Sequence, residues 1–484
     1  MTTHNDPKST QVPWYLGIIP FTLLIVLLYF VIRYFGGDAL AGASQVVLLI
    51  CTGSIIAIAV LFYHIPWENI EKAIVNNIKS IAMALLVLIL IGAIAGSWMV
   101  SGVVPSLIYY GLQILTPGLF LLVACIVSAL VSLITGSSWT TVATIGVALI
   151  GIGTVLGFSP AMTAGAIISG AYFGDKLSPL SDTTIVASSI NEVPLFSHIR
   201  YMMVTTIPSF TIACVLFLVI SLCHQNGDGL PPNDFNDALV GTFHISPWLM
   251  IVPAITVILI IKRIPSVITL FLSSLIAIAT AAIVQPDLVM SVGDGNMFKG
   301  MLISLYGQTN IDTGNAVLND LVSTNGMVGM LNVVFLICCS SAFGGALTGS
   351  GMANSFTEML SRHLKKRTSI VASTVATGIG ANMATGDQYL SIILTSNLFS
   401  RLYKDQGYES RLLSRSSEDS ATVTSVLIPW NTCGMTQSSV LGVATLTYLP
   451  YCFFNLVSPL VSIIIAATGY KIIRHTCTSH PTGS

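Results

Sequence analysis

The stretch GDKLSPLSDTT, residues Gly174 to Thr184, is the part of the chain on which the expected fold depends. It follows an apolar run at 161–173 and brings two carboxylates, one lysine, four hydroxyl residues and a proline together within eleven positions. A charged side chain at the centre of a membrane helix costs roughly 2.5–3.5 kcal/mol, and unpaired backbone groups in lipid are also costly. At membrane depth such a stretch must line a cavity that protein encloses. We therefore expect an ion or substrate site on a broken helix.

The composition is that of a polytopic membrane protein. Of the 484 residues, 54% are hydrophobic and only 8% are charged, and the mean hydropathy is +0.84, values outside the usual range of soluble domains. Nine cysteines are scattered without CxxC or Cys/His ligand spacing. Because the sequence also lacks a nucleophile–base pair and a phosphate-loop spacing, we expect no enzyme and no cofactor.

Apolar runs of membrane-spanning length recur along the chain, each close to the about 20 residues that a bilayer core requires. They lie at 14–35, 40–63, 80–102, 199–223, 247–261, 266–285, 328–349 and 450–470. Elsewhere two pairs of apolar arms meet at a polar tip: 119–135 and 142–158 flank TGSSWTT, and 368–384 and 389–403 flank TGDQYLS. Such pairs predict re-entrant hairpins, which are tolerated where protein surrounds the tip. Glycines at 344, 345, 349 and 351 are expected to allow close helix packing.

Matching features recur at a nearly constant offset. Thr135 and Gly136 at the first tip lie 250 positions before Thr385 and Gly386, and PWYLGIIP at 13–20 is echoed by PWLMIVP at 247–253. The pattern predicts an all-α polytopic membrane protein with two inverted-topology repeats of about five transmembrane helices, each with a re-entrant hairpin and a broken helix. The expected divisions are a cytoplasmic tail at 1–12, repeats at 13–230 and 247–475, an extracytoplasmic linker at 231–246 and a cytoplasmic tail at 476–484.

The distribution of basic residues sets the expected orientation. With five crossings per half and a cytoplasmic N-terminus, sixteen of the 19 Lys and Arg residues lie inside, Arg33 and Lys299 lie outside, and Lys176 lies in the membrane. An even number of crossings per half, or the opposite orientation, breaks this bias. The positive-inside rule therefore favours ten crossings with both termini in the cytoplasm of a bacterial-type inner membrane.

Each expected hairpin tip has a helix break beside it. The breaks are GDKLSPLSDTT in the first half and EDSATVTSVLIPWNT at 418–432 in the second, where Pro179 and Pro429 each remove a helix hydrogen bond. Freed carbonyls, hydroxyls and carboxylates suit a hard cation. By position after the prolines, Asn431 is taken as the counterpart of Asp182. The candidate ion- or substrate-binding residues are Thr135, Ser137, Ser138, Asp175, Ser178, Ser181, Asp182, Thr183, Asp387, Gln388, Asp419, Thr424, Asn431 and Thr432, with Asp175, Asp182 and Asp387 as the metal ligands.

Several of these carboxylates also have a purely structural interpretation. Asp175 could pair with Lys176 and merely satisfy the break, whereas Asp182 and Asp387 could cap helices. Asp419 could be held at the cytoplasmic mouth by nearby arginines. We expect Lys176 to be the structural partner of a carboxylate and not the counter-charge of a substrate.

Three stretches resemble the signature sequences of NhaC-type sodium/proton antiporters. They are GAYFGDKLSPLSDTT with the following HIRYM, TGDQYLSIIL, and SRSSEDSATVTSVLIPWNTCG. The similarity spans nearly the whole chain. It implies an inverted-repeat fold of about ten helices and electrochemical exchange of Na⁺ for H⁺, and it fixes the scaffold better than the cargo, because relatives in that family exchange organic acids or take up amino acids.

The leading functional hypothesis is exchange of Na⁺ or Li⁺ for H⁺ by alternating access, in which a buried carboxylate binds one cation or the other. At the expected depth there are about five carboxylates against one lysine and no arginine, which favours a cation as cargo. The alternative is a Na⁺- or H⁺-coupled exchanger of a small organic solute, a malate/lactate-type acid or an amino acid, since hydroxyl-rich tips with free amides could hold a carboxylate. Expected partners are membrane lipid and the transported ions or solute, with no nucleic acid; a homodimer is left open.

Overall fold

The computed structural model describes residues 13–35, 42–223, 232–262, 264–314, 318–319, 322–352 and 366–472. These residues form helices and connecting turns. They contain one isolated β-bridge, between Thr309 and Thr324, and no β-strand. The helices before the linker are α1 (Trp14–Phe35), α2 (Ala43–Ala57), η2 (Ile58–Phe62), α3 (Trp67–Val100), α4 (Val103–Ile114), η3 (Pro117–Leu119), α5 (Phe120–Thr135), α6 (Ser138–Thr141), η4 (Val142–Gly146), α7 (Val147–Val155), α8 (Pro160–Leu177), α9 (Asp182–Ile190) and α10 (Leu195–Cys223).

The remaining helices continue from the expected linker to the end of the described chain. They are α11 (Pro232–Thr242), η5 (Pro247–Met250), α12 (Ile251–Ile261), α13 (Ser266–Val284), α14 (Pro286–Val292), α15 (Met297–Tyr306), α17 (Gly326–Gly329), α18 (Leu331–Gly349), α20 (Arg367–Thr385), α21 (Gln388–Asp405), α22 (Ser410–Ser417), η6 (Glu418–Thr422), η7 (Ser425–Leu427), α23 (Thr432–Leu441), α24 (Thr445–Tyr448), η8 (Leu449–Tyr451) and α25 (Phe453–Thr468). The segment expected as a linker is thus largely helical, because α11 occupies most of it.

Seven helical segments among the described residues are long and apolar enough to cross a membrane, or up to nine if each of two bent pairs is one span. The pairs bend by 85° between α11 and the η5–α12 run, and by 58° between the α24–η8 run and α25. The expected run at 450–470 is therefore not one straight helix. The seven segments are Ala43–Phe62, Ile81–Val100, Pro117–Thr135, Ser138–Val155, Leu195–Cys223, Ser266–Val284 and Gly326–Gly349. A polytopic all-helical membrane protein is confirmed.

Helix α3 is longer than the sequence suggested. It begins at Trp67, 13 residues before the expected start at 80, and has 34 residues. The added turns are amphipathic: Ile70 is fully buried while Glu71 and Lys72 are exposed. Helix α18 packs against one side of these added turns. They lengthen the helix although they do not belong to the apolar run.

Glycines allow α3 and α18 to pack closely. A side chain at Gly345 would meet the backbone of Ile74, and one at Gly349 would meet the backbone of Ile70. Asn77 Nδ2 donates to the carbonyl of Ser341 over 2.7 Å in the same contact. The expectation of close packing is confirmed at these glycines and at 344, where the neighbour is the backbone of Thr385, but a side chain at 351 would have nothing within 4 Å.

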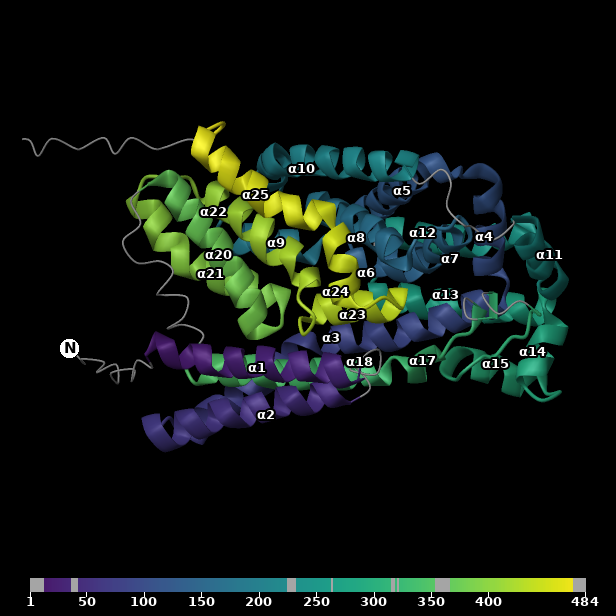
Figure 1. Ribbon diagram of the computed structural model, residues 1–484, viewed down its shortest axis with the longest axis horizontal. Coiled ribbons are helices and arrows are strands. Elements are labelled where there is room, and N and C mark those ends of the chain that lie inside the picture. Colours follow the sequence, from purple (N-terminus) through teal and green to yellow (C-terminus); the bar gives the residue numbers. More distant parts are fainter. Residues whose placement is uncertain are drawn as a thin grey trace, which may run out of the picture.

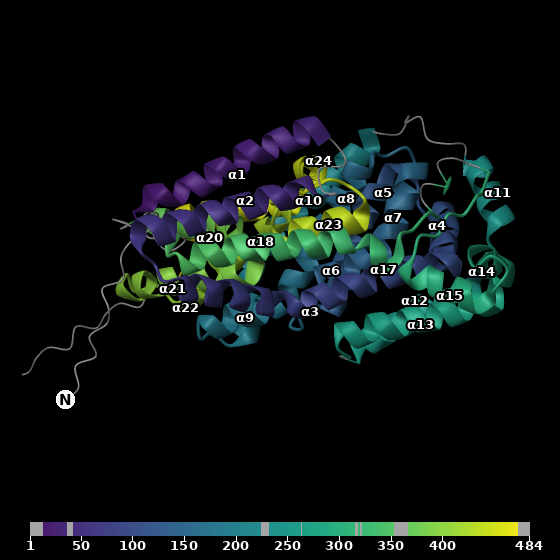
Figure 2. The ribbon, with the colours of Figure 1, turned by 90° about the horizontal axis from the view of Figure 1, so that it is seen from below.

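The helices form two main groups along a common long axis. In Figure 1, α1, α3, α13 and α18 lie below α5, α8, α10 and α25, and Figure 2 shows α1, α2, α18, α3 and α13 side by side in one layer. The first turn of α1 and the last turn of α25 lie at the same end in Figure 1, with α20, α21 and α22. Helices α11, α14 and α15 lie at the other end.

Both predicted helix breaks are present. After α8 ends at Leu177, the chain is unwound until α9 begins at Asp182. In the second half, α22 passes into a π-helical turn, η6, then into the 3₁₀ turn η7, before α23 begins at Thr432. Pro179 and Pro429 lie in the two unwound segments, where the missing N–H of proline ends each helix.

Candidate functional site

The first tip, between α5 and α6, is a tight turn fixed by its own hydroxyl groups. Gly136 adopts the left-handed conformation with φ +68°, which glycine reaches at least cost. Thr135 Oγ1 accepts the Ser137 N–H over 3.2 Å, and Ser137 Oγ in turn accepts the Thr140 N–H over 3.2 Å as the helix cap. A side chain at Gly136 would come within 2.7 Å of the Leu180 backbone. The tip therefore lies directly against the first helix break.

The second tip, between α20 and α21, repeats this construction 250 positions later. Gly386 has φ +66°, and Thr385 Oγ1 accepts the Asp387 N–H over 3.2 Å. Asp387 Oδ1 accepts the Leu390 N–H over 2.9 Å, so this carboxylate is a helix cap, as the structural interpretation allowed. A side chain at Gly386 would lie 3.3 Å from the Trp430 carbonyl oxygen, in the second break.

Polar contacts at equivalent positions connect each tip to the segment around its break. Asp175 Oδ2 accepts hydrogen bonds from Ser138 N over 3.1 Å and from Ser138 Oγ over 2.7 Å. The residues 250 positions further on also meet, because Ser425 Oγ donates to Gln388 Oε1 over 3.3 Å. Asp175 is only 6% exposed and has no basic partner within the described part of the chain. The carboxylate thus faces the N-terminus of the helical run that begins at Ser138, an end that favours negative charge.

The unwound segments are closed by side-chain caps. Ser178 Oγ accepts the Leu180 N–H over 3.2 Å, and Ser181 caps α9 while Asn431 caps α23. Asn431 therefore corresponds to Ser181, and the assignment of Asn431 as the counterpart of Asp182 is wrong, since the equivalent caps lie 250 positions apart. Asp182, the first residue of α9, is exposed and does not cap the helix.

The other hydroxyl candidates brace the backbone around the breaks. Thr183 Oγ1 lies 3.0 Å from Ser181 Oγ, and Thr424 Oγ1 donates over 2.7 Å to the carbonyl four residues earlier. The backbone N–H of Thr432 donates to the Gly386 carbonyl over 2.8 Å, which joins the second break to the second tip. These groups already have partners, so they hold the shape of the site in this conformation.

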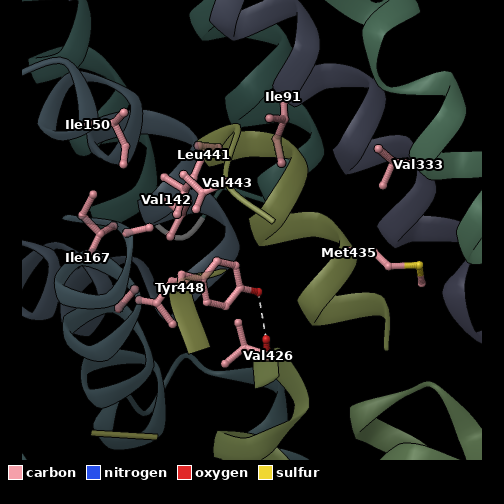
Figure 3. Close-up of a cluster of buried hydrophobic side chains, with 14 of the residues drawn as sticks. Ile91, Val142, Ile150, Ile167, Val333, Val426, Met435, Leu441, Val443 and Tyr448 are labelled. Carbon is pink, nitrogen blue, oxygen red and sulfur yellow. Dashed lines mark hydrogen bonds between the residues drawn. The ribbon is translucent and has the colours of Figure 1, made fainter. Parts of the chain in front are cut away.

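A hydrophobic cluster supports the second break. Figure 3 shows Val142 and Ile167 from the first half close to Val426 and Leu441 from the second. In this cluster Tyr448 Oη donates to the Val426 carbonyl over 2.8 Å, as the dashed line in Figure 3 marks. The bond satisfies a carbonyl that lies in the irregular chain before the break.

Asp419 makes a different set of contacts from Asp175. It forms a buried ion pair with Lys176, accepts from Thr205 Oγ1 over 2.9 Å, and lies 3.7 Å from Arg415 Nε. Lys176 Nζ also donates to Ser458 Oγ over 3.3 Å. The expectation that Lys176 is the structural partner of a carboxylate is confirmed. That carboxylate is Asp419, 243 positions away, and not the adjacent Asp175.

Two more buried charged residues lie beside this pair: Glu418, counted among the about five carboxylates but not chosen as a binding residue, and Arg415, one of the arginines expected near Asp419 at the cytoplasmic mouth. Arg415 is fully buried, has no hydrogen-bond partner on its guanidinium, and places that group 4.6 Å from the centre of the Tyr201 ring. The premise that no arginine lies beside the carboxylates is therefore wrong. Glu418 is also fully buried, and neither of its carboxylate oxygens has a hydrogen-bond partner. The i, i+4 spacing of Arg415 and Asp419 was the available signal.

The three carboxylates expected as metal ligands do not form one ligand set. Among the described residues no three His, Cys, Asp or Glu side chains lie close enough to hold a metal ion. Asp175 instead accepts from Ser138 at the first tip, Asp387 caps α21 at the second tip, and Asp182 is the exposed first residue of α9. The arrangement offers separate anionic groups at the two tips and the first break.

Comparison with known proteins identifies the family of the chain. The model of the Na⁺/H⁺ antiporter family matches residues 2–189 and 170–470, which together cover nearly the whole chain. The chain belongs to the Na⁺/H⁺ antiporter family. The family resemblance stated from the sequence motifs is thereby confirmed, and membership indicates a membrane transporter.

Relatives in this family differ in what their names say they carry. The chain is 36% identical to the Na⁺/H⁺ antiporter NhaC of Bacillus subtilis, over 84% of this chain and 88% of that one. It is 36% identical to NhaC of Alkalihalophilus pseudofirmus, over 94% of this chain and 96% of that one. It is 35% identical to the malate-2H⁺/Na⁺-lactate antiporter of Bacillus subtilis, over 85% of this chain and 86% of that one.

Proposed function

We propose that this protein exchanges Na⁺, or Li⁺, for H⁺ across the inner membrane by alternating access. The observation that carries the proposal is the state of Asp175, a buried carboxylate that accepts two hydrogen bonds from Ser138 and has no basic partner in the described chain. A buried carboxylate without a counter-charge is costly, so it must bind a proton or a metal cation. Family membership and the two NhaC relatives support the same cargo.

Competition for one carboxylate gives exchange. When the site faces the side with more protons, Asp175 takes up H⁺ and releases the cation; when it faces the other side, the reverse occurs. Burial disfavours an ionised Asp175 with no bound cation. The protein in that form therefore rarely changes from one orientation to the other, and this couples the flux of H⁺ to the flux of the metal cation. Asp182 and Asp387 are proposed to contribute negative charge near the path, with Ser137, Gln388 and Thr432 shaping the tips.

We further propose that the halves are inverted repeats with re-entrant tips and cytoplasmic termini. Support comes from the tip and break contacts that recur at an offset of 250 residues, and from the excess of basic residues at the ends assigned to the cytoplasm. Polar tips then meet near mid-membrane from opposite sides.

A second candidate is Na⁺- or H⁺-coupled exchange of a small organic solute. The specific observations in its favour are the buried Arg415, whose guanidinium lacks hydrogen bonds, and the relative whose name gives malate and lactate. An arginine fork binds a carboxylate in bidentate fashion.

Transport in liposomes decides between the two. The purified protein is reconstituted with an internal pH-sensitive dye, and Na⁺, Li⁺, K⁺, malate, lactate and amino acids are added in turn. We expect Na⁺ and Li⁺ to move protons without any organic solute. A pH response to an organic solute with none to Na⁺ or Li⁺ would replace the first candidate with the second.

Within that assay, Asp175→Asn should abolish exchange while the protein still folds and inserts, because the amide keeps the Ser138 contact but binds no proton. Asp405→Asn is the matched control, since Asp405 is exposed at the end of α21 and pairs loosely with Arg401 at 3.7 Å. Wild-type exchange by Asp175→Asn would place the site elsewhere.

A further inference from the structure

A cavity of about 500 Å³ lies where α10 and α22 begin and α25 ends. Three of its lining residues are basic: Arg200, Arg411 and Lys471. Figure 1 shows these three helices together at the end of the molecule where α1 begins. By the charge distribution this is the proposed cytoplasmic end, and the cavity is separate from the two tips.

The positive charge of this cavity is not balanced by its surroundings. Arg411 is paired with Glu409, but Arg200 and Lys471 make no ion pair with any described residue. Two uncompensated cations and one shared cation around a single cavity favour an anion as the occupant.

The cavity wall is fixed by more than surface side chains. Two guanidinium groups lie near the Tyr201 ring, Arg411 at 4.9 Å and Arg415 at 4.6 Å from its centre. Tyr201 Oη donates to the Lys471 carbonyl over 3.1 Å, and Lys471 has φ +53°, a left-handed conformation that a non-glycine residue adopts at some cost. The tyrosine thus holds the backbone of Lys471 at the rim.

Apolar side chains of α10 are exposed beside the cavity. Phe196, which lines the cavity, is 74% exposed, and Ile207 two turns beyond Arg200 is 49% exposed. Along a membrane helix such residues face acyl chains. Arginine and lysine beside a phosphate make charge-assisted hydrogen bonds, and a lipid headgroup brings a phosphate to this depth.

We propose that this cavity binds a phosphate ester, supplied by the headgroup of an anionic phospholipid. The inference does not depend on the cargo proposed above. Tyr201 lines the cavity and lies 4.6 Å from the Arg415 guanidinium, which in turn lies 3.7 Å from Asp419, so we expect an anion in the cavity to influence the charge cluster around Lys176. That additional effect on transport rests on the proposed function, whereas binding itself does not.

Lipid binding is measured on the full-length protein in neutral detergent, titrated with mixed micelles of phosphatidylglycerol or phosphatidylcholine. The readouts are lipid retained by native mass spectrometry and the thermal unfolding midpoint. Separate arms use glycerol phosphate and inorganic phosphate. We expect phosphatidylglycerol to bind and stabilise the wild type, and phosphatidylcholine to do neither.

The decisive variant is Arg200→Gln with Lys471→Gln, in which we expect phosphatidylglycerol to bind at least about tenfold more weakly. The control is Arg401→Gln with Lys404→Gln, which removes the same charge from the exposed end of α21 and should bind as the wild type does. If the double variant fails to fold, the Lys471→Gln single variant is tested in its place, and we expect it too to bind phosphatidylglycerol more weakly than the wild type.

If phosphatidylglycerol binding weakened equally in the Arg200→Gln/Lys471→Gln variant and in the control variant, the proposal would be overturned, because the effect would be one of general surface charge. A wild type that responds alike to both lipids would also overturn it. A response to glycerol phosphate as strong as to the lipid would support the phosphate site and overturn the lipid as its source. A cargo other than Na⁺ in the liposome assay changes none of these binding results.

Discussion

Asp175 and Asp419 are both buried carboxylates, but only Asp419 of the two has a basic partner among the described residues. Asp419 has Lys176 and the Thr205 hydroxyl, so its negative charge is compensated in the folded protein. Asp175 has two hydrogen bonds from Ser138 and no cation. A permanently compensated carboxylate has little affinity left for a transported ion, and the free one retains it. This contrast is why Asp175, and not Asp419, is the proposed exchange site.

The Lys176–Asp419 pair leads to a stability prediction. Lys176→Met leaves Asp419 buried with no lysine, and losing one partner of a buried pair typically costs about 3–5 kcal/mol. The double change Lys176→Met with Asp419→Leu should cost clearly less, because no charge is stranded. Denaturant unfolding in detergent measures both. If the single and double variants lost the same free energy of unfolding, the loss would not come from the stranded charge of the Lys176–Asp419 pair.

The exposed pair Lys299–Asp294 is the control for that experiment. Its side chains are 52% and 79% exposed, so water screens the interaction. Lys299→Met should unfold at the same denaturant concentration as the wild type.

Sequence reasoning identified residue types at the site better than their partners. The polar composition of the first break was enough to single out Asp175 and to expect Lys176 beside a carboxylate. It could not show which carboxylate, because Asp419 is brought there only when the two halves pack. Arg415 was assigned to the cytoplasmic surface by the charge rule, although the ring of Tyr201 and the nearby Asp419 hold it inside.

At the scale of elements, close packing of α5 and α8 positions Asp175. A side chain at Gly170 would meet the Cys125 carbonyl carbon at 2.9 Å and the Ala129 nitrogen at 3.0 Å, and Gly174 lies one turn further along the same face. Both neighbours are backbone, which cannot rotate away. The four-residue spacing of the glycines is the pattern that lets two membrane helices approach.

Gly170→Ala should therefore destabilise the protein and reduce exchange, because α8 must move away from α5. Gly53→Ala in α2 is the control: nothing lies within 4 Å of the added methyl group. In a helix interior alanine is better than glycine by roughly 0.5–1 kcal/mol, so this control should be neutral or slightly stabilising. Thermal unfolding of both variants is the measurement, and equal midpoints would contradict the packing argument.

Elements were predictable where local chemistry fixes them. Pro179 and Pro429 mark the breaks, and the Thr-Gly dipeptides mark the tips, since glycine alone takes the left-handed turn easily. The start of α3 was not predictable from apolar length, because its first turns carry Glu71 and Lys72 and are held by packing on α18. The π-helical turn η6 likewise has no local signal in its sequence.

At the scale of the whole molecule, the proposed topology places the first turn of α15 outside and the end of α21 inside. These segments lie at opposite ends in Figure 1. Lys299→Cys and Lys404→Cys, each in a background without the exposed Cys223, should react with a membrane-impermeant thiol reagent from opposite faces of sealed vesicles. Labelling of both from one face would contradict the inverted arrangement.

The buried pair between α8 and η6 also limits how the molecule can move. Lys176 belongs to one half of the chain and Asp419 to the other, so the two broken helices cannot separate without exposing both charges to lipid or water. We therefore expect them to move as one body in the proposed transport cycle. The moving boundary of that cycle would then lie against the layer of α1, α2, α3, α13 and α18, where Ser340 Oγ donates to the Trp430 carbonyl over 2.6 Å, and we expect this contact to break and re-form in each cycle.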